Sequence, residues 1–227
     1  MLFRSVLGST DADTRRLLTG YARPKTRVIA TENRGLAAAR NLGVEAARGR
    51  YLCALDADDR LEPTYFEKAV RLLDAQPALA FVSSWLRTFG DEEWEWTPER
   101  CDLPALLAEC TVSTAALVRR SAVLAVGGYD VAMGTQGYED WDLWISLVER
   151  GYTGTILPEV LFHYRRRAGS MSTHCNEGDA HLGLMEYLIT KHDESYRRHL
   201  FDVLLRREAD ATALLRTNYR LEREVGG

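Results

Sequence analysis

The sequence predicts an α/β fold with a mostly parallel sheet flanked by helices. Between residues 27 and 85, short apolar segments typical of strands alternate with longer segments typical of helices. Residues 51–55 are a continuous apolar run, as expected for a strand that is buried on both faces. Three acids, Asp56, Asp58 and Asp59, follow this run directly. They should lie beyond the carboxyl end of a strand, where parallel sheets bind their ligands.

The first half of the chain can be assigned from local composition. The predicted order is strand 27–30, helix 36–48, strand 51–55, a helix opened by Pro63, and strand 79–85. The first helix is rich in Ala and ends at Gly49, a residue favoured after helix ends. The second helix should bury the face that carries Phe66, Ala69, Val70 and Leu73. Residues 86–110 are less regular and resemble a variable insertion.

The second half ends in a long helical region. The predicted order is strand 113–118, a short helix ending at Gly127 and Gly128, helix 139–150, strands 153–157 and 160–164, and helical residues 181–223. We therefore expect an α/β domain at 1–175 and a helical extension at 176–227.

A seam of residues at spacings of four and three runs through the last helix. Its members are Leu200, Leu204, Arg207, Ala211, Leu214, Asn218 and Leu221. The seam is typical of a helix that docks on the core, and a helix that forms a homodimer as a coiled coil is the alternative.

Composition restricts the class of protein. Lys and Arg number 29 and Asp and Glu 33, which gives a net charge of −4 without the basic excess of a nucleic-acid-binding surface. We therefore expect no nucleic-acid partner. The four cysteines form no CxxC pair, as is typical of free thiols in a reducing compartment. No signal peptide or membrane span is recognisable, so we expect a cytoplasmic protein, or one peripheral to the inner face of the membrane.

Three clusters of charged residues are candidates for chemistry. Asp56, Asp58 and Asp59 present the oxygen ligands that Mg²⁺ or Mn²⁺ prefers, although a solvated acidic loop is the alternative. Glu139 and Asp140 begin the predicted helix 139–150, where an acid can cap the helix or act as a general base. The basic residues 165–167 follow a strand and could clamp a diphosphate or form a solvated face.

Taken together, the motifs resemble those of family 2 glycosyltransferases of the GT-A fold. The resemblance covers about residues 8–172 and depends on the order of the motifs. These are residues 33–41 (NRGLAAARN), 49–51 (GRY), 55–59 (LDADD), 127–130 (GGYD), 139–144 (EDWDLW), 164–165 (YR) and 170–172 (SMS). The implied fold is a GT-A, or Rossmann-like, sheet with a helical C-terminal extension.

The resemblance also implies an activity and its residues. Members of this family transfer a sugar from a nucleotide-diphosphate donor, usually with inversion. Here the donor would be of the UDP, GDP or dTDP type. The acceptor would be a glycan or lipid-linked glycan in bacterial polysaccharide synthesis. By position in the motifs, Asp58 and Asp56 would bind Mn²⁺ or Mg²⁺. Arg40, Asp56 and Arg165 would bind the donor. Asp140, with Glu139 beside it, would deprotonate the acceptor.

The beginning of the chain departs from the family pattern. Gly8, Ser9, Thr10 and Asp11 match the end of an early motif, but Val6 and Leu7 stand in place of its two acids. About one strand and one helix are therefore expected to be missing, either because the reading frame is incomplete or because the protein is shortened.

Two further hypotheses remain open. One is a catalytically inactive sugar-nucleotide-binding or scaffold protein. The other is a nucleotidyltransferase, which is disfavoured because the N-terminal region has no Gly-rich basic phosphate loop.

Overall fold

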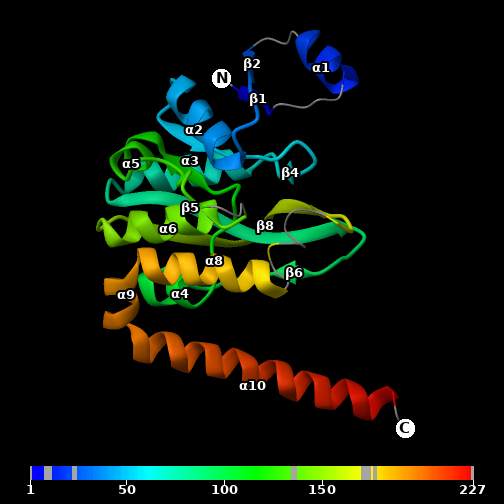
Figure 1. Cartoon of the computed structure of the whole chain (residues 1–227), viewed down its shortest axis with the longest axis vertical. Coiled ribbons are helices and arrows are strands. Elements are labelled where there is room, and N and C mark those ends of the chain that lie inside the picture. Colours follow the sequence, from blue (N-terminus) through cyan, green and yellow to red (C-terminus); the bar gives the residue numbers. More distant parts are fainter. Residues whose placement is uncertain are drawn as a thin grey trace.

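The computed structural model describes residues 2–7, 12–21, 25–133, 137–169, 175 and 178–225, and its strands form two sheets (Figure 1). β1 (Leu2–Leu7) and β2 (Thr26–Thr31) form a parallel pair joined through α1 (Ala12–Thr19). The larger sheet has the order β3 (Tyr51–Cys53), β7 (Leu117–Arg119), β5 (Leu79–Gly90), β8 (Thr153–Arg166) and β4 (Arg60–Leu61), and β6 (Glu95–Trp96) also pairs with β5.

The larger sheet is mixed, which corrects the prediction of a mostly parallel sheet. β5 and β8 pair in parallel, whereas β7 is antiparallel to both β3 and β5. β4 pairs antiparallel with β8, and β6 pairs antiparallel with β5. β3, β5 and β8 therefore run in one direction, as the alternation of strands and helices predicted. The later strand β7 lies between β3 and β5, so these two strands are not neighbours in the sheet.

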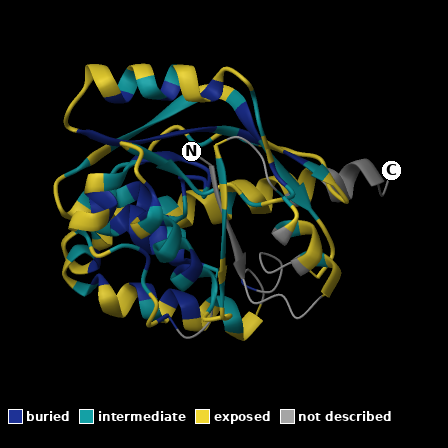
Figure 2. Ribbon diagram, turned by 90° about the horizontal axis from the view of Figure 1, so that it is seen from above, coloured by how far each residue is buried: buried dark blue, intermediate teal, exposed yellow. Residues whose placement is uncertain are grey.

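Helices cover both faces of this sheet. Tyr65, Ala69 and Leu73 of α3 (Tyr65–Ala75) pack on one face against Val82 and Leu117. The other face packs against α2 (Leu36–Ala46), α4 (Leu103–Ala108), α5 (Arg120–Ala125), α6 (Glu139–Glu149) and α8 (Gly178–Lys191). Figure 2 shows the buried residues gathered in the strands and on the adjacent helix surfaces.

Several predicted elements differ in extent. Residues 86–110 are more regular than predicted, because β5 continues to Gly90 and α4 buries four of its six residues. The predicted strands 153–157 and 160–164 form one strand, β8, with a register irregularity opposite Ser84 and Trp85. Phe66 is 43% exposed, because the buried face of α3 follows Tyr65 at intervals of four residues.

The C-terminal region is helical, as predicted, and consists of three helices. α8 is followed by α9 (Asp193–Arg198) and α10 (Leu200–Val225). Leu184, Met185 and Leu188 of α8 belong to the main hydrophobic core. The division at 175/176 stays a prediction. α10 begins next to α9 and α4 and then extends away from the rest of the molecule towards the C-terminus (Figure 1). Leu200, Leu204 and Leu214 are all more than half exposed, so the predicted seam does not dock on the core.

None of the described helices combines the length and apolar composition needed to cross a bilayer.

Candidate functional site

The turn after β3 places the predicted metal-binding acids at one end of the sheet. The amide of Asp59 donates to the carbonyl of Asp56 at 3.2 Å, which folds the chain back toward β4. The carboxylate of Asp59 is buried: its Oδ1 accepts from the amide of Arg165 at 2.8 Å, and its Oδ2 has no hydrogen-bond partner among the residues that the structure describes. Burial raises the pKa of Asp59 to about 7. Asp59 thus fixes the acidic turn to the end of β8.

The end of β8 brings the predicted basic cluster to the same turn. The guanidinium of Arg165 lies 4.5 Å from the centre of the Phe89 ring and donates through Nε to the carbonyl of Asp58 at 3.3 Å. Arg167 forms an ion pair with the carboxylate of Asp58 at 2.6 Å. Arg165 and Arg167 therefore contact Asp58, although they lie about 110 residues away from it in the sequence.

Arg40 of α2 connects the acidic turn with the start of α6. Its guanidinium lies 3.7 Å from the carboxylate of Asp56 and donates to Oε1 of Glu139. The ring of Tyr129 stacks beneath it at 5.5 Å. Burial acts to lower the pKa of Arg40, but the surrounding phenol and carboxylates together raise it above its usual value. Arg40 is thus a buried, charged centre of the site.

Asn41, the next residue on α2, holds the backbone that positions Tyr129. Its amide group donates to the carbonyl of Tyr129, and its Oδ1 accepts from the amide of Tyr129, both at 2.8 Å. Gly128 has a φ of +84°, and a Cβ there would lie 2.4 Å from Oδ1 of Asn41. The glycine is required both by its backbone conformation and by this close approach.

The two acids at the start of α6 have different surroundings. Both carboxylate oxygens of Glu139 are occupied, by Arg40 and by the amide of Gly137 at 2.9 Å. Asp140 accepts at Oδ1 from the amide of Trp141 at 2.8 Å. Burial and the neighbouring Glu139 raise the pKa of Asp140 to about 7. Asp140 is therefore the acid suited to exchange a proton near neutral pH.

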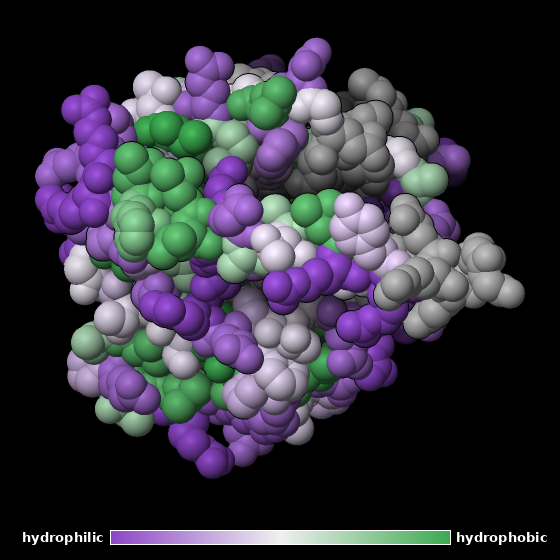
Figure 3. Space-filling view, turned by 90° about the horizontal axis from the view of Figure 1, so that it is seen from below, coloured by the Kyte–Doolittle hydropathy of each residue, from purple (hydrophilic) through white to green (hydrophobic). Residues whose placement is uncertain are grey.

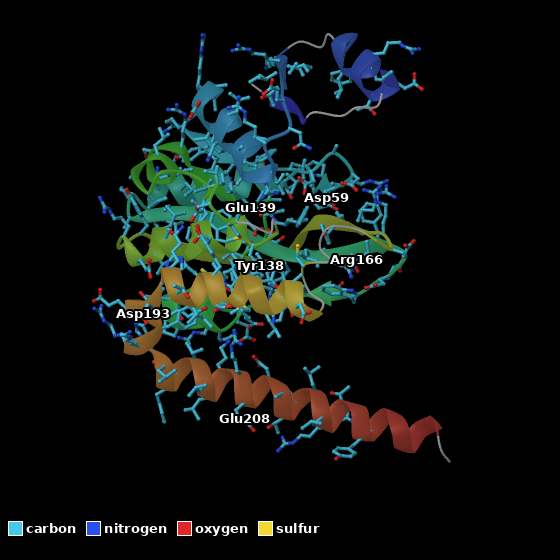
Figure 4. All side chains as sticks on the ribbon, viewed as in Figure 1. Asp59, Tyr138, Glu139, Arg166, Asp193 and Glu208 are labelled. Carbon is cyan, nitrogen blue, oxygen red and sulfur yellow. The ribbon has the colours of Figure 1, made fainter. Side chains whose placement is uncertain are left out.

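A small pocket opens beside this pair of acids. It is lined by Arg34, Ala37, Asp130, Val131, Met133 and Glu139. In Figure 4 the labelled Glu139 and Asp59 lie on the same side of β8, and Glu208 on α10 lies far from both.

A network of charged residues connects the wall of this pocket to the C-terminal helices. Lys191 donates to Asp130 at 2.6 Å and to Asp142 at 2.8 Å. Asp142 also contacts Nε2 of His192 at 3.0 Å, and Glu149 contacts the other ring nitrogen at 2.8 Å. Asp142 and His192 are 1% and 4% exposed, whereas Lys191 and Glu149 lie at the surface, so the network has a buried centre and exposed ends.

The structure brings together the site residues that the sequence predicted. Arg40, Asp56 and Glu139 form one contact group, which the acidic turn joins to Asp58 and Arg165. Asp140 follows Glu139 at the edge of this group. Sequence reasoning did not assign roles to Asn41 or Tyr129, although both lie within motifs that it singled out. The predicted residues 170–172 and 8–11 lie outside the described residues.

The donor atoms at the acidic turn fit a hard divalent cation. Asp58 is one-third exposed on its side chain, and Asp56 presents a second partly exposed carboxylate. Among the described residues no group of three or more His, Cys, Asp or Glu side chains is arranged to hold a metal. Two carboxylates would leave coordination positions for phosphate oxygens of a ligand, an arrangement that suits Mg²⁺.

Comparison with known proteins agrees with these motifs. The model of glycosyl transferase family 2 matches residues 8–124, and that of glycosyltransferase like family 2 matches residues 78–222. An uncharacterized protein of Sinorhizobium fredii is 30% identical over 71% of this chain and 18% of its own length. An uncharacterized glycosyltransferase of Methanocaldococcus jannaschii is 29% identical over 66% of this chain and 54% of its own.

Other matches have named activities or solved structures. The Escherichia coli UDP-Glc:alpha-D-GlcNAc-diphosphoundecaprenol beta-1,3-glucosyltransferase WfaP is 24% identical over 65% of this chain and 59% of its own length. The crystal structure of S. aureus TarS 1-349 in complex with UDP-GlcNAc matches with a TM-score of 0.62 and 14% identity, over 82% of this chain and 56% of that one. This likeness confirms the predicted GT-A fold.

The chain spans about half of the length of several of these relatives, and much less of the first. The two family models nevertheless match more than half of the chain each. With the order of its motifs and its fold, the chain belongs to glycosyltransferase family 2.

Proposed function

We propose that this chain transfers a sugar from a nucleotide-diphosphate sugar to a hydroxyl acceptor with inversion, and that Asp140 is the general base. The observation that carries the proposal is the environment of Asp140, whose pKa is raised to about 7 beside a buried ion pair. A carboxylate of this kind can accept the acceptor's proton near neutral pH as the hydroxyl attacks. Glu139 has both oxygens occupied, so its role is to hold Arg40.

The donor would bind across the acidic turn, α2 and the end of β8. Arg40 and Asp56 form the part of this surface that would contact the nucleotide, and Arg165 lies where it can reach the diphosphate. Arg167 already pairs with Asp58, so it would exchange this carboxylate for a phosphate when the donor arrives. These contacts support a donor with two adjacent phosphates.

Asp58 and Asp56 would hold Mn²⁺ or Mg²⁺. The cation would supply charge stabilisation for the departing diphosphate. The protein residues orient the donor beside it. A single base then suffices on the acceptor side, unlike in a glycosidase, which also protonates its leaving group with a second carboxyl group.

The acceptor is proposed to be a glycan or a lipid-linked glycan in bacterial polysaccharide assembly. A named relative, the Escherichia coli glucosyltransferase WfaP, acts on a diphosphoundecaprenol-linked sugar according to its name, which supports this class. The pocket beside Glu139 is the position for the acceptor hydroxyl. A location in the cytoplasm, with contact to the inner face of the membrane, stays a prediction, and so does a homodimer formed through the C-terminal helix.

The test is a thermal-shift panel with UDP, GDP, dTDP and CMP, each with and without Mn²⁺. A ligand that binds the folded state raises the melting temperature by mass action. We expect one of the diphosphates to raise it in the presence of Mn²⁺, and Asp58→Ala to abolish the metal-dependent part. Glu93→Ala, at an exposed acid between β5 and β6, is the matched control and should respond like the wild type.

The same panel can overturn the proposal. A folded protein that responds to none of the nucleotides would be an inactive or scaffold member of the family. An equal response of the Asp58→Ala variant would remove Asp58 from the site.

A further inference from the structure

α10 exposes an apolar surface that the rest of the described chain does not cover. The exposed large apolar side chains of α10 are Leu200, Phe201, Leu204, Leu205, Leu214, Leu215 and Tyr219, each 52–74% accessible. Val203 is the one buried side chain among those described on this helix. A salt bridge of 2.7 Å between Arg206 and Glu109 marks where the helix touches the end of α4. Figure 3 shows hydrophobic side chains gathered over the beginning of α10.

Most of these side chains share one face of the helix. At 100° per residue, Leu204, Leu215 and Tyr219 fall within about 60° of one another, and Phe201 projects in the same direction as Tyr219. Val203, which faces the body of the protein, lies about 130° from the centre of this group. We call this group, together with Leu200 and Leu205, the outer face of α10. The outer face is directed away from the domain, so a second molecule can reach it.

Among the side chains described on α10, two opposite charges lie on the outer face. Glu208 projects among its apolar side chains, and Arg216 lies at its edge. Both are exposed, and neither forms an ion pair with any described residue. They are equally far from Thr212 along the helix, four residues before it and four residues after it.

We propose that α10 pairs with α10 of a second copy of this chain in an antiparallel dimer whose two-fold axis passes near Thr212. In such a pair, residues at equal distances on either side of the axis face each other. Glu208 of each copy then faces Arg216 of the other. Leu205 faces Tyr219 in the same way, so apolar contacts flank the two ion pairs.

The apolar area and the charged residues of the outer face favour a second copy of this chain as its partner. The outer face offers roughly 700 Å² of apolar surface per copy, close to the roughly 800 Å² per partner of a standard stable interface. A membrane surface is disfavoured, because Glu208 would be buried among lipids without a cation. In the dimer, Arg216 of each copy is the cation that pairs with Glu208 of the other copy. This inference does not depend on the proposed glycosyl transfer.

The experiment measures the mass of the full 227-residue chain by sedimentation equilibrium across the micromolar range. We expect a dimer for the wild type. Glu208→Arg and Arg216→Glu should each raise the dissociation constant about tenfold, because each places like charges opposite each other at two symmetric positions. The double charge reversal, which restores both pairs, should return the constant to near the wild-type value.

Asp210→Arg is the matched control, since this acid projects from the opposite side of the same helix and should leave the constant unchanged. Circular dichroism melting verifies that all variants fold. A monomeric wild type, or a double reversal that stays as weak as the single variants, would overturn the proposal. A monomer that co-sediments with phosphatidylglycerol vesicles would overturn it in favour of a membrane partner.

Discussion

The contact between Asn41 and the backbone at Tyr129 predicts different responses of two neighbouring glycines. Gly127 and Gly128 have nearly equal φ angles, +89° and +84°, so alanine at either position should cost about 1–2 kcal/mol of backbone strain. A Cβ at Gly127 meets nothing within 4 Å, whereas a Cβ at Gly128 displaces the Asn41 side chain. Losing the two hydrogen bonds to Tyr129 adds about 2 kcal/mol. We therefore expect Gly128→Ala to melt about 4–8 °C below Gly127→Ala.

Calorimetry or urea unfolding of the two variants measures this difference directly. The same pair in an Asn41→Ala background is the control, since the obstructing side chain is then absent. There the two glycine variants should agree to within about 0.5 kcal/mol. Equal destabilisation in the wild-type background would refute the reasoning, because it would mean that Asn41 can move aside at no cost.

Three further predictions follow from the charged residues and the core. Asp140→Asn should lower turnover about 10³-fold, measured as nucleotide release in the presence of acceptor, and should keep the thermal shift caused by the donor nucleotide. In the wild type the rate should rise with pH through about 7, the raised pKa of Asp140. A flat pH profile would exclude Asp140 as the base. Burial acts to lower the pKa of His192, but its hydrogen bonds to Asp142 and Glu149 raise it overall. The contribution of His192 to stability is therefore complete below about pH 6.5 and is lost as the pH rises through the raised pKa of His192. Above that pKa the urea midpoint of the wild type should approach that of His192→Gln. A difference in midpoint that stays constant with pH would contradict a charged His192 in this network. Gly154→Ala should fail to fold or melt far below the wild type, because its Cβ would lie 1.9 Å from a core phenylalanine ring; a cooperative melt near the wild-type temperature would contradict the packing.

The sequence predicted most of the helices and the common direction of β3, β5 and β8, but it predicted neither the antiparallel strands nor the strand order. The helix at 139–149 and the one at 36–46 could be recognised, because local composition and terminal glycines determine them. Composition does not reveal that β7 inserts between β3 and β5, because this pairing joins residues more than 30 positions apart. Nor does it reveal that residues 86–110 complete the core rather than interrupt it.

The candidate site was predictable only as a set of motifs. Asp56, Glu139 and Arg40 could be identified from the family pattern. That the guanidinium of Arg40 contacts both carboxylates depends on tertiary structure, which the pattern does not show. The difference between Glu139 and Asp140 depends on burial and on hydrogen-bond partners, which adjacent positions in a sequence do not distinguish. Asp59 was grouped with the candidate metal-binding acids, and only the structure shows that its carboxylate is buried and accepts from the amide of Arg165.

The charged network between α6 and the C-terminal helices determines where this chain can be divided for expression. A fragment ending at residue 175 would lose Lys191 and His192, the two basic partners of Asp142. A buried carboxylate left without a cation destabilises a domain by about 3–5 kcal/mol, a large part of the stability of a typical domain. A shortened protein should therefore keep α8, α9 and the beginning of α10 through Arg206, because Val203 is buried in the core and Arg206 pairs with Glu109. The exposed remainder of α10 can be removed with the network left whole.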